Sequence, residues 1–237
     1  MSNRTNNASG FMSHMTYQAH AQELSETKYN LIIGGCLTWG FLINFLLMQF
    51  AAPSIMQMIY RNPTSYSGIM IGIVIGYFIL VMIGSGMVRS FSPGKCFIGY
   101  NLIAVPVGLL ASIAMIGYDP SLVIRAVLIT AIITLTMMIV SMIFPAAFSR
   151  MGSGLSIALL AVILVESLAM LFFRMDITIL DWVVVGIMSL YIGFDWVRAN
   201  SVQRTTTNAI AAASALYLDI INILLRVLRI LSRSRRD

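Results

Sequence analysis

The sequence is poor in charged residues. Only 10% of its 237 residues are Asp, Glu, Lys or Arg, while 59% are hydrophobic and the mean hydropathy is +0.88. Soluble globular domains carry about 25% charged residues, so this composition excludes that class. The composition therefore predicts a polytopic integral membrane protein whose main partner is the lipid bilayer.

The chain also has few of the side chains that membrane enzymes use. Both histidines, His14 and His20, lie in the polar first 29 residues, so no apolar run supplies the histidine of an intramembrane protease or of a zinc site. Cys36 and Cys96 have neither paired spacing nor a neighbouring histidine, which indicates packing residues. These absences argue against hydrolysis, and we expect a protein that is not an enzyme and has no cofactor.

Positive charge is concentrated at the C-terminus, although the formal net charge is only +6. The last twelve residues contain Arg226, Arg229, Arg233, Arg235 and Arg236. This basic end is expected to contact anionic lipid headgroups. The other basic residues are scattered singly between apolar runs, so no nucleic-acid partner is predicted.

Seven apolar runs are each about 20 residues long, the length that crosses a ~30 Å hydrocarbon core. They cover roughly 31–52, 68–88, 97–117, 122–145, 154–173, 177–197 and 209–231. The longest connection, "APSIMQMIYRNPTSYSG", contains Pro53 and Pro63, which disfavour uninterrupted helix. The sequence thus predicts an all-α bundle of seven transmembrane helices, with a polar N-terminal tail over 1–29, a membrane domain over 30–231 and a basic tail over 232–237.

Basic residues in the connections set an expected orientation. Those after the second, fourth and sixth runs are Arg89, Lys95, Arg150, Arg198 and Arg204, whereas the other side holds Arg61 and Arg174, with Arg125 at the start of the fourth run. This excess places the even-numbered connections and the N-terminus in the cytoplasm. The side of the C-terminus stays open, because a full crossing of the last run puts its arginines outside and a re-entrant or shallow segment keeps them in the cytoplasm.

The last apolar run carries a polar stripe. At 100° per residue, Asp219, Asn222, Arg226, Arg229 and Arg233 fall within about 80° of one another, and Asp219 lies roughly 15 Å from the start of the helix. Such a stripe fits an interfacial amphipathic helix with its charges in water. The scarcity of other polar residues near Asp219 favours the alternative, a seventh helix that is surrounded by protein at the centre of the bundle.

Two further carboxylates lie at membrane depth and count as candidate functional groups because charge is costly there. Asp195 ends the sixth run in "SLYIGFDWVRAN", where pairing with Arg198 is the simplest expectation. Glu166 lies among aliphatic residues, so burial would favour its uncharged form. The remaining candidates, Asp119, Asp176 and Asp181, are expected to be loop or helix-end residues.

The motif "LYIGFD", followed after a polar connection by "ALYLDIINILLRVLRIL", resembles the ending of the Bax inhibitor-1 family, which typically reads like "SLYLDFINLFLYLLRLLG". The resemblance implies a bacterial-type member in the inner (plasma) membrane that acts as a pH-sensitive calcium leak channel, with Ca²⁺ as the permeant ion. It also implies that Asp195 and Asp219, 24 residues apart, form a proton-sharing pair at the cytoplasmic side of the pore. Arg89, in "GMVRSFSPGK", corresponds to a family arginine that assists this latch.

A shared proton would tie the sixth and seventh helices together, and loss of that proton would leave two carboxylates that repel each other and face a passing cation. Transient Ca²⁺ binding is expected at Asp195 and Asp219, with Asn222 and Glu166 as further polar candidates along the pore. Two alternatives stay open: a non-conducting regulator that partners a membrane protease or acts in a stress response, and a proton-coupled transporter that uses Glu166 and Asp219.

Overall fold

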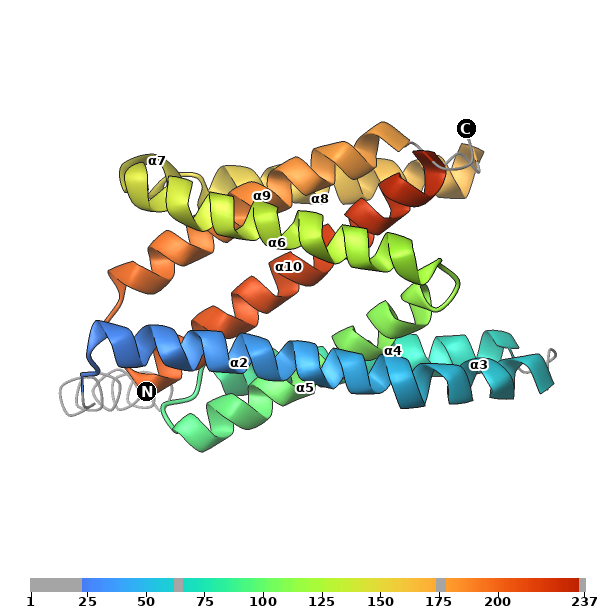
Figure 1. Cartoon of the computed structure of the whole chain (residues 1–237), viewed down its shortest axis with the longest axis horizontal. Helices are drawn as coiled ribbons and strands as arrows, with labels where there is room; N and C mark the ends of the chain where they lie inside the picture. The colour runs from blue at the N-terminus through green and yellow to red at the C-terminus, as the bar shows by residue number, and fades with distance from the viewer. Residues whose placement is uncertain (1–22, 62–65, 174–177, 235–237) are drawn as a thin grey trace, which may run out of the picture.

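The computed structural model describes residues 23–61, 66–173 and 178–234, and its regular elements are helices (Figure 1). In chain order they are α2 (Glu26–Leu46), the π-helix η1 (Leu47–Ala51), α3 (Ala52–Arg61), α4 (Tyr66–Val88), α5 (Pro93–Met115), α6 (Pro120–Ile143), α7 (Pro145–Ser149), α8 (Gly152–Leu168), the π-helix η3 (Ala169–Phe173), α9 (Thr178–Ser201) and α10 (Thr206–Ser234). Seven helical segments within these ranges are long and apolar enough to cross a membrane. The predicted all-α fold with seven spans is confirmed.

The first span runs without interruption from Glu26 to Arg61, so the break expected at Pro53 is wrong. Proline lacks a backbone N–H and crowds the preceding turn, which normally bends or ends a helix. Here the π-helix η1 ends two residues before Pro53. Its wider turns accommodate a residue that cannot donate a backbone hydrogen bond, so the helix continues through Pro53. Pro63 lies outside the described residues.

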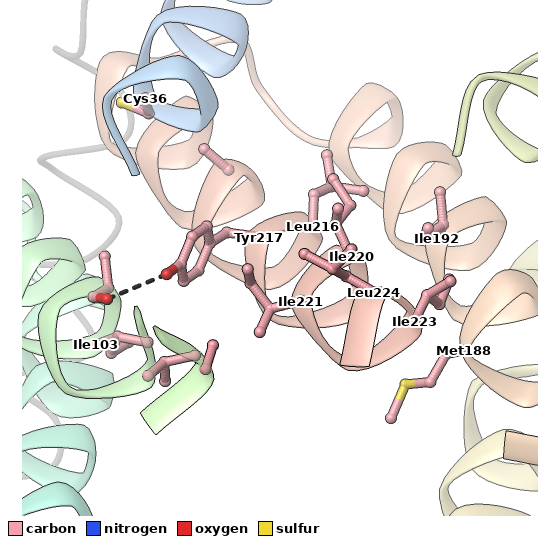
Figure 2. Close-up of a cluster of buried hydrophobic side chains, with 14 of the residues drawn as sticks. Cys36, Ile103, Met188, Ile192, Leu216, Tyr217, Ile220, Ile221, Ile223 and Leu224 are labelled. Carbon is pink, nitrogen blue, oxygen red and sulfur yellow. Dashed lines mark hydrogen bonds between the residues drawn. The ribbon is translucent and has the colours of Figure 1, made fainter. Parts of the chain in front are cut away.

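Helix α10 occupies the centre of the bundle, as predicted for the seventh helix. It packs against α9, α2, α5 and α6. Figure 2 shows its apolar side chains between Ile103 of α5 on one side and Met188 and Ile192 of α9 on the other. Leu216, Tyr217 and Ile223 are completely buried. An amphipathic helix lying at the interface is therefore excluded.

The two ends of α10 lie at opposite ends of the bundle. In Figure 1 α10 starts beside the N-terminal end of α2 and runs diagonally to the far end, where the C-terminus lies. The 29 residues of α10 span about 43 Å at 1.5 Å per residue, more than the hydrocarbon thickness of ~30 Å. The last helix is thus a single continuous segment that is long enough to cross fully.

Glycine allows α4 and α5 to pack backbone against backbone. A Cβ on Gly84 would lie 2.7 Å from the carbonyl oxygen of Gly99, and a Cβ on Gly99 would lie 2.6 Å from the backbone nitrogen of Val88. Any larger residue would therefore push the two helices apart. Close approach at small residues is the usual way that helices associate in lipid, where no water drives apolar faces together.

A hydrogen-bonded tyrosine joins α10 to α2 and α5. The hydroxyl of Tyr217 donates toward the Oδ1 of Asn44 at 2.7 Å and the carbonyl oxygen of Ala104 at 3.1 Å. A second buried hydroxyl, that of Tyr100, donates to the carbonyl oxygen of Cys36 at 2.7 Å. Each tyrosine combines a large packed ring with a satisfied polar group, so the central helix is held at a defined height and rotation.

Both cysteines are free thiols buried in this core, which confirms that they are packing residues. Cys36 lies on α2 close to Tyr100, and the Cys96 thiol donates to the carbonyl oxygen of Ser90 at 2.8 Å. Burial of an apolar, weakly donating group is the common environment of a structural cysteine.

Candidate functional site

The carboxyl groups of Asp195 and Asp219 meet at the contact between α9 and α10. Asp195 lies near the end of α9 and Asp219 near the middle of α10, and the two side chains are close enough to interact electrostatically. Asp219 is only 8% exposed, and its Oδ2 receives no hydrogen bond from a donor among the described residues. Because an ionised carboxylate only accepts hydrogen bonds, a bond between the two groups requires a proton on one of them.

A cavity of about 280 Å³ opens beside this pair. Asp195 and Arg198 from α9 line it, and Arg89, directly after α4, faces the same hollow. Its other polar lining residues are Ser85, Asn208 and Ser214. The site therefore combines a carboxyl pair with two cationic side chains at the edge of a polar hollow.

A second hollow of about 540 Å³ lies next to the first. Asp195 and Arg198 line this hollow as well, together with Ser156 and Tyr191, whose hydroxyl oxygens are 2.8 Å apart. Asp195 thus stands between two solvent-accessible spaces. A carboxyl group in this position can exchange its proton with water while it contacts its buried partner.

The other predicted site residues are placed differently. Arg89 lines the same cavity as Asp195, although the described structure gives it no hydrogen bond or ion pair to the carboxyl pair. Asn222 is exposed on α10 and donates to the carbonyl oxygen of Leu218 in its own helix. Glu166 lies away from both cavities, at the contact between α8 and α10. Of the five predicted residues, the structure brings together Asp195, Asp219 and Arg89.

Two carboxyl groups make a sparse ligand set for a metal ion. Among residues 23–61, 66–173 and 178–234, no group of three or more His, Cys, Asp or Glu side chains could hold a metal. Ca²⁺ takes six to eight oxygen ligands, roughly, in protein sites. The pair could therefore contact a hydrated cation in passing, and it is not built to retain one.

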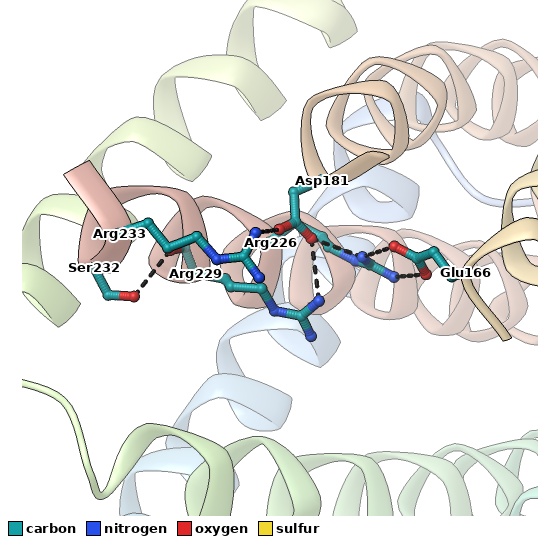
Figure 3. Close-up of polar contacts among 6 residues, drawn as sticks. All are labelled: Glu166, Asp181, Arg226, Arg229, Ser232 and Arg233. Carbon is teal, nitrogen blue, oxygen red and sulfur yellow. Dashed lines mark hydrogen bonds and ion pairs between the residues drawn. The ribbon is translucent and has the colours of Figure 1, made fainter. Parts of the chain in front are cut away.

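An ionic network that sequence reasoning missed lies at the other end of α10 (Figure 3). The guanidinium of Arg226 pairs with both carboxylate oxygens of Glu166, the Nη2 to Oε2 contact being 2.8 Å, and donates to Oδ1 of Asp181 at 2.7 Å. Arg229 donates to the same Oδ1 at 3.2 Å, and Arg233 donates to Oδ2 at 3.1 Å. One carboxylate thus accepts from three arginines, and the network connects α8, α9 and α10.

This network corrects two expectations. Asp181 lies in the first turn of α9, yet its side chain is 1% exposed, so it is a buried acceptor rather than an ordinary helix-end residue. Glu166 is ion-paired with Arg226, so it has a charged partner that its aliphatic neighbours in the sequence did not indicate. The spacing of the three arginines at one face of α10 was a usable signal, because charges at membrane depth need partners. Asp119 is the N-cap of α6 as expected, and Asp176 lies outside the described residues.

The fold and the site define a polytopic α-helical membrane protein with a polar site inside its helix bundle. The model of the family described as inhibitor of apoptosis-promoting Bax1 matches residues 21–236, almost the whole chain. The chain belongs to this Bax inhibitor-1 family, which is not generally enzymatic. The match extends the resemblance seen in the last two helices to all seven spans.

Two curated relatives are similar to the chain over most of its length. Both are called inner membrane protein YbhL, one from Escherichia coli K12 and the other from Escherichia coli O6:H1 strain CFT073. Each is 26% identical over 223 residues, which cover 87% of this chain and 92% of the relative. No solved structure matches the chain.

Proposed function

We propose that this protein is a pH-sensitive calcium leak channel of the Bax inhibitor-1 type, gated by proton sharing between Asp195 and Asp219. The observation that carries the proposal is the contact between these two carboxyl groups at the edge of polar cavities. The similarity to YbhL supports a location in the bacterial inner membrane.

The proposed gate works through the charge state of the pair. With one proton bound, a carboxyl-to-carboxylate hydrogen bond ties α9 to α10 and keeps the bundle closed. When the pH rises and that proton leaves, two negative charges repel each other across a poorly solvated contact. Separation of the helices then joins the hollows beside Asp195 and presents two carboxylates to a cation. The leak is therefore expected to increase with pH.

The distribution of unpaired charge supports an orientation with the N-terminal end of α2 in the cytoplasm. The start of α2 and the α4–α5, α7–α8 and α9–α10 connections lie at that end of the bundle (Figure 1). Lys28, Arg89, Lys95 and Arg150 belong to the first three of these segments. The arginines of α10 lie at the opposite end, but two carboxylates already neutralise most of their charge. The basic end of the last helix is thus compatible with the positive-inside rule, and the carboxyl pair lies toward the cytoplasmic half.

The gate can be tested by Ca²⁺ flux into proteoliposomes that contain a calcium-sensitive dye, measured over a series of pH values. Asn resembles a permanently protonated Asp, because its amide can still donate to the remaining carboxylate. Asp195→Asn and Asp219→Asn are each expected to hold the latch closed, so that flux stays low and no longer rises with pH. Glu26→Gln, at an exposed ion pair with Arg204, is the matched control and is expected to keep the wild-type profile.

Three outcomes separate the alternatives. A wild-type pH profile in both Asp variants would reject the latch while leaving conduction intact. Absence of flux from the wild-type protein at every pH would favour a non-conducting regulator. Flux that requires a second solute would favour a transporter, although Glu166 is engaged by Arg226 and is poorly placed to carry a proton.

A further inference from the structure

One face of α10, called the lane below, is less buried than the other faces between the cavities and the ionic network. Ala211, Ala215 and Leu218 line the first cavity or its neighbour, Asn222 follows one turn later and is exposed, and Arg226 comes one turn after Asn222. The other faces of α10 are buried, as shown by Leu216, Tyr217, Val227 and Leu228. The lane therefore leads from the carboxyl pair toward the far end of the bundle.

Arg226 ends this lane. Its side chain is 19% exposed and reaches Glu166 on α8 and Asp181 on α9, so that its guanidinium bridges three helices across the face that carries Asn222 (Figure 3). Arg229 and Arg233 strengthen the attachment of α9 to α10 through the same Asp181 carboxylate. A partly buried guanidinium that is paired with two carboxylates resists displacement, because moving the guanidinium or either carboxylate leaves a charge without its partner.

We propose that this network, with Arg226 as its central residue, is the closure of the ion pathway at the end opposite to the Asp195–Asp219 pair. This inference rests on the proposed function, since it names a second barrier on the same route. The cationic guanidinium of Arg226 lies across this face and opposes the passage of Ca²⁺. Conduction thus requires that the guanidinium of Arg226 leave its place between α8 and α9.

The two barriers are separate in the structure. Arg226 follows Asp219 by seven residues, or about 10 Å along the axis of α10. Their chemistry also differs, because the carboxyl pair responds to a proton, whereas the far end is held by ion pairs. Loss of Arg226 should therefore change how far the pathway opens without changing the pH at which the carboxyl pair releases its proton.

Thiol accessibility tests the closure without measuring flux. A membrane-impermeant methanethiosulfonate reagent is added to the face of the membrane at which α10 ends, and its reaction with Asn222→Cys is timed. In the Arg226→Gln background the reaction is expected to be about tenfold faster or more, the shift that loss of a charge-assisted hydrogen bond gives to an opening equilibrium. The wild-type protein, whose two native thiols are buried, gives the background rate.

Two companion variants keep the test interpretable. Glu166→Gln removes a partner of Arg226 but leaves Asp181 in place, so it should accelerate labelling in the same direction by a smaller factor. Arg204→Gln removes an arginine from an exposed pair at the other end of the bundle and should leave the rate unchanged. Elution of each variant as a single species in size-exclusion chromatography checks its fold. Equal labelling rates with Arg226 and with Gln, including no labelling in either, would overturn the closure.

Flux measurements then distinguish this closure from the gate. If both proposals hold, Arg226→Gln raises the alkaline plateau of Ca²⁺ flux by about tenfold while the midpoint pH stays in place. Faster labelling without any Ca²⁺ flux in the wild type or the variant would reject the channel and retain the closure of the lane. Normal wild-type flux with labelling that is independent of Arg226 would reject the closure alone.

Discussion

Replacing Tyr217 with Phe isolates the contribution of one hydrogen bond at the centre of the bundle. The ring of Tyr217 is completely buried and packs against Phe41 and Tyr100, with ring centroids 5.8 and 6.0 Å away. Phe keeps these contacts and fills nearly the same volume, so the packing contribution to stability is retained. The substitution removes only the hydroxyl that donates to Asn44 and the carbonyl oxygen of Ala104.

The expected cost follows from what the hydroxyl leaves behind. Asn44 is 6% exposed, and its Nδ2 already has no hydrogen-bond partner in the described structure, so loss of the Tyr217 hydroxyl leaves the whole amide unpaired. An unsatisfied buried polar group costs about 1–3 kcal/mol. Hydrogen bonds between membrane helices average about 0.6 kcal/mol and reach about 1.7 kcal/mol in measured cases. We therefore expect Tyr217→Phe to lower the free energy of unfolding by about 1–2 kcal/mol.

This free energy can be measured by titrating the purified protein with SDS in mixed micelles and following helix content by circular dichroism. Tyr191→Phe is the matched control, because the hydroxyl of Tyr191 bonds to Ser156 at an exposed position where solvent can replace it. Its expected effect is below about 0.5 kcal/mol. A double-mutant cycle with Asn44→Ala should give a coupling energy of about 1 kcal/mol. A coupling near zero, with Tyr217→Phe as stable as the wild type, would refute the reasoning.

Three further predictions concern packing, charge and burial. Gly99→Ala should destabilise the protein by about 1–3 kcal/mol in the same SDS titration, because the new Cβ meets the backbone of α4. Gly86→Ala is the control: a Cβ at Gly86 has open space around it, so the substitution should be neutral or slightly stabilising. Asp181→Asn should cost about 3 kcal/mol or more, because three arginines lose the buried carboxylate that they share, and Glu26→Gln should cost less than about 1 kcal/mol. Similar values for both would contradict the burial argument. Cys96 should resist maleimide in the native state and react fully in SDS, as mass spectrometry can show.

The number and type of the membrane spans could be predicted because both depend on local composition. A helix in lipid satisfies its own backbone hydrogen bonds, so a run of about 20 apolar residues is sufficient to form a span. The ends of the helices were less predictable: α2 begins at Glu26 and α10 ends at Ser234, beyond the expected spans of 31–52 and 209–231. Polar residues extend helices into the headgroup region, where hydropathy gives no signal.

The charged groups of the last three helices show where prediction from sequence stopped. Asp195 and Asp219 were identified through a motif, since the chain itself places them 24 residues apart. Asp181 was expected to be a loop or helix-end residue; it does lie in the first turn of α9, but its burial and its partners were not anticipated. Its three arginine partners come from α10, between 45 and 52 residues later in the chain. No local pattern specifies a partner at that distance.

The sequence by itself determined that this protein is a seven-span helical membrane protein, that its last helix carries a polar stripe, and that its ending belongs with the Bax inhibitor-1 family. The length and composition of the apolar runs are enough for the first conclusion, because lipid imposes the same requirement on every helix. Helical spacing gives the second, and the third rests on the motif in the last two helices. Only the tertiary structure decided which charges meet. The diagonal course of α10 brings Asp219 to Asp195 at one level and Arg226 to Glu166 and Asp181 at another. The angles at which the helices pack determine which of these charged side chains come into contact. Those angles depend in turn on contacts elsewhere in the bundle, such as the hydrogen bond between Tyr217 and Asn44.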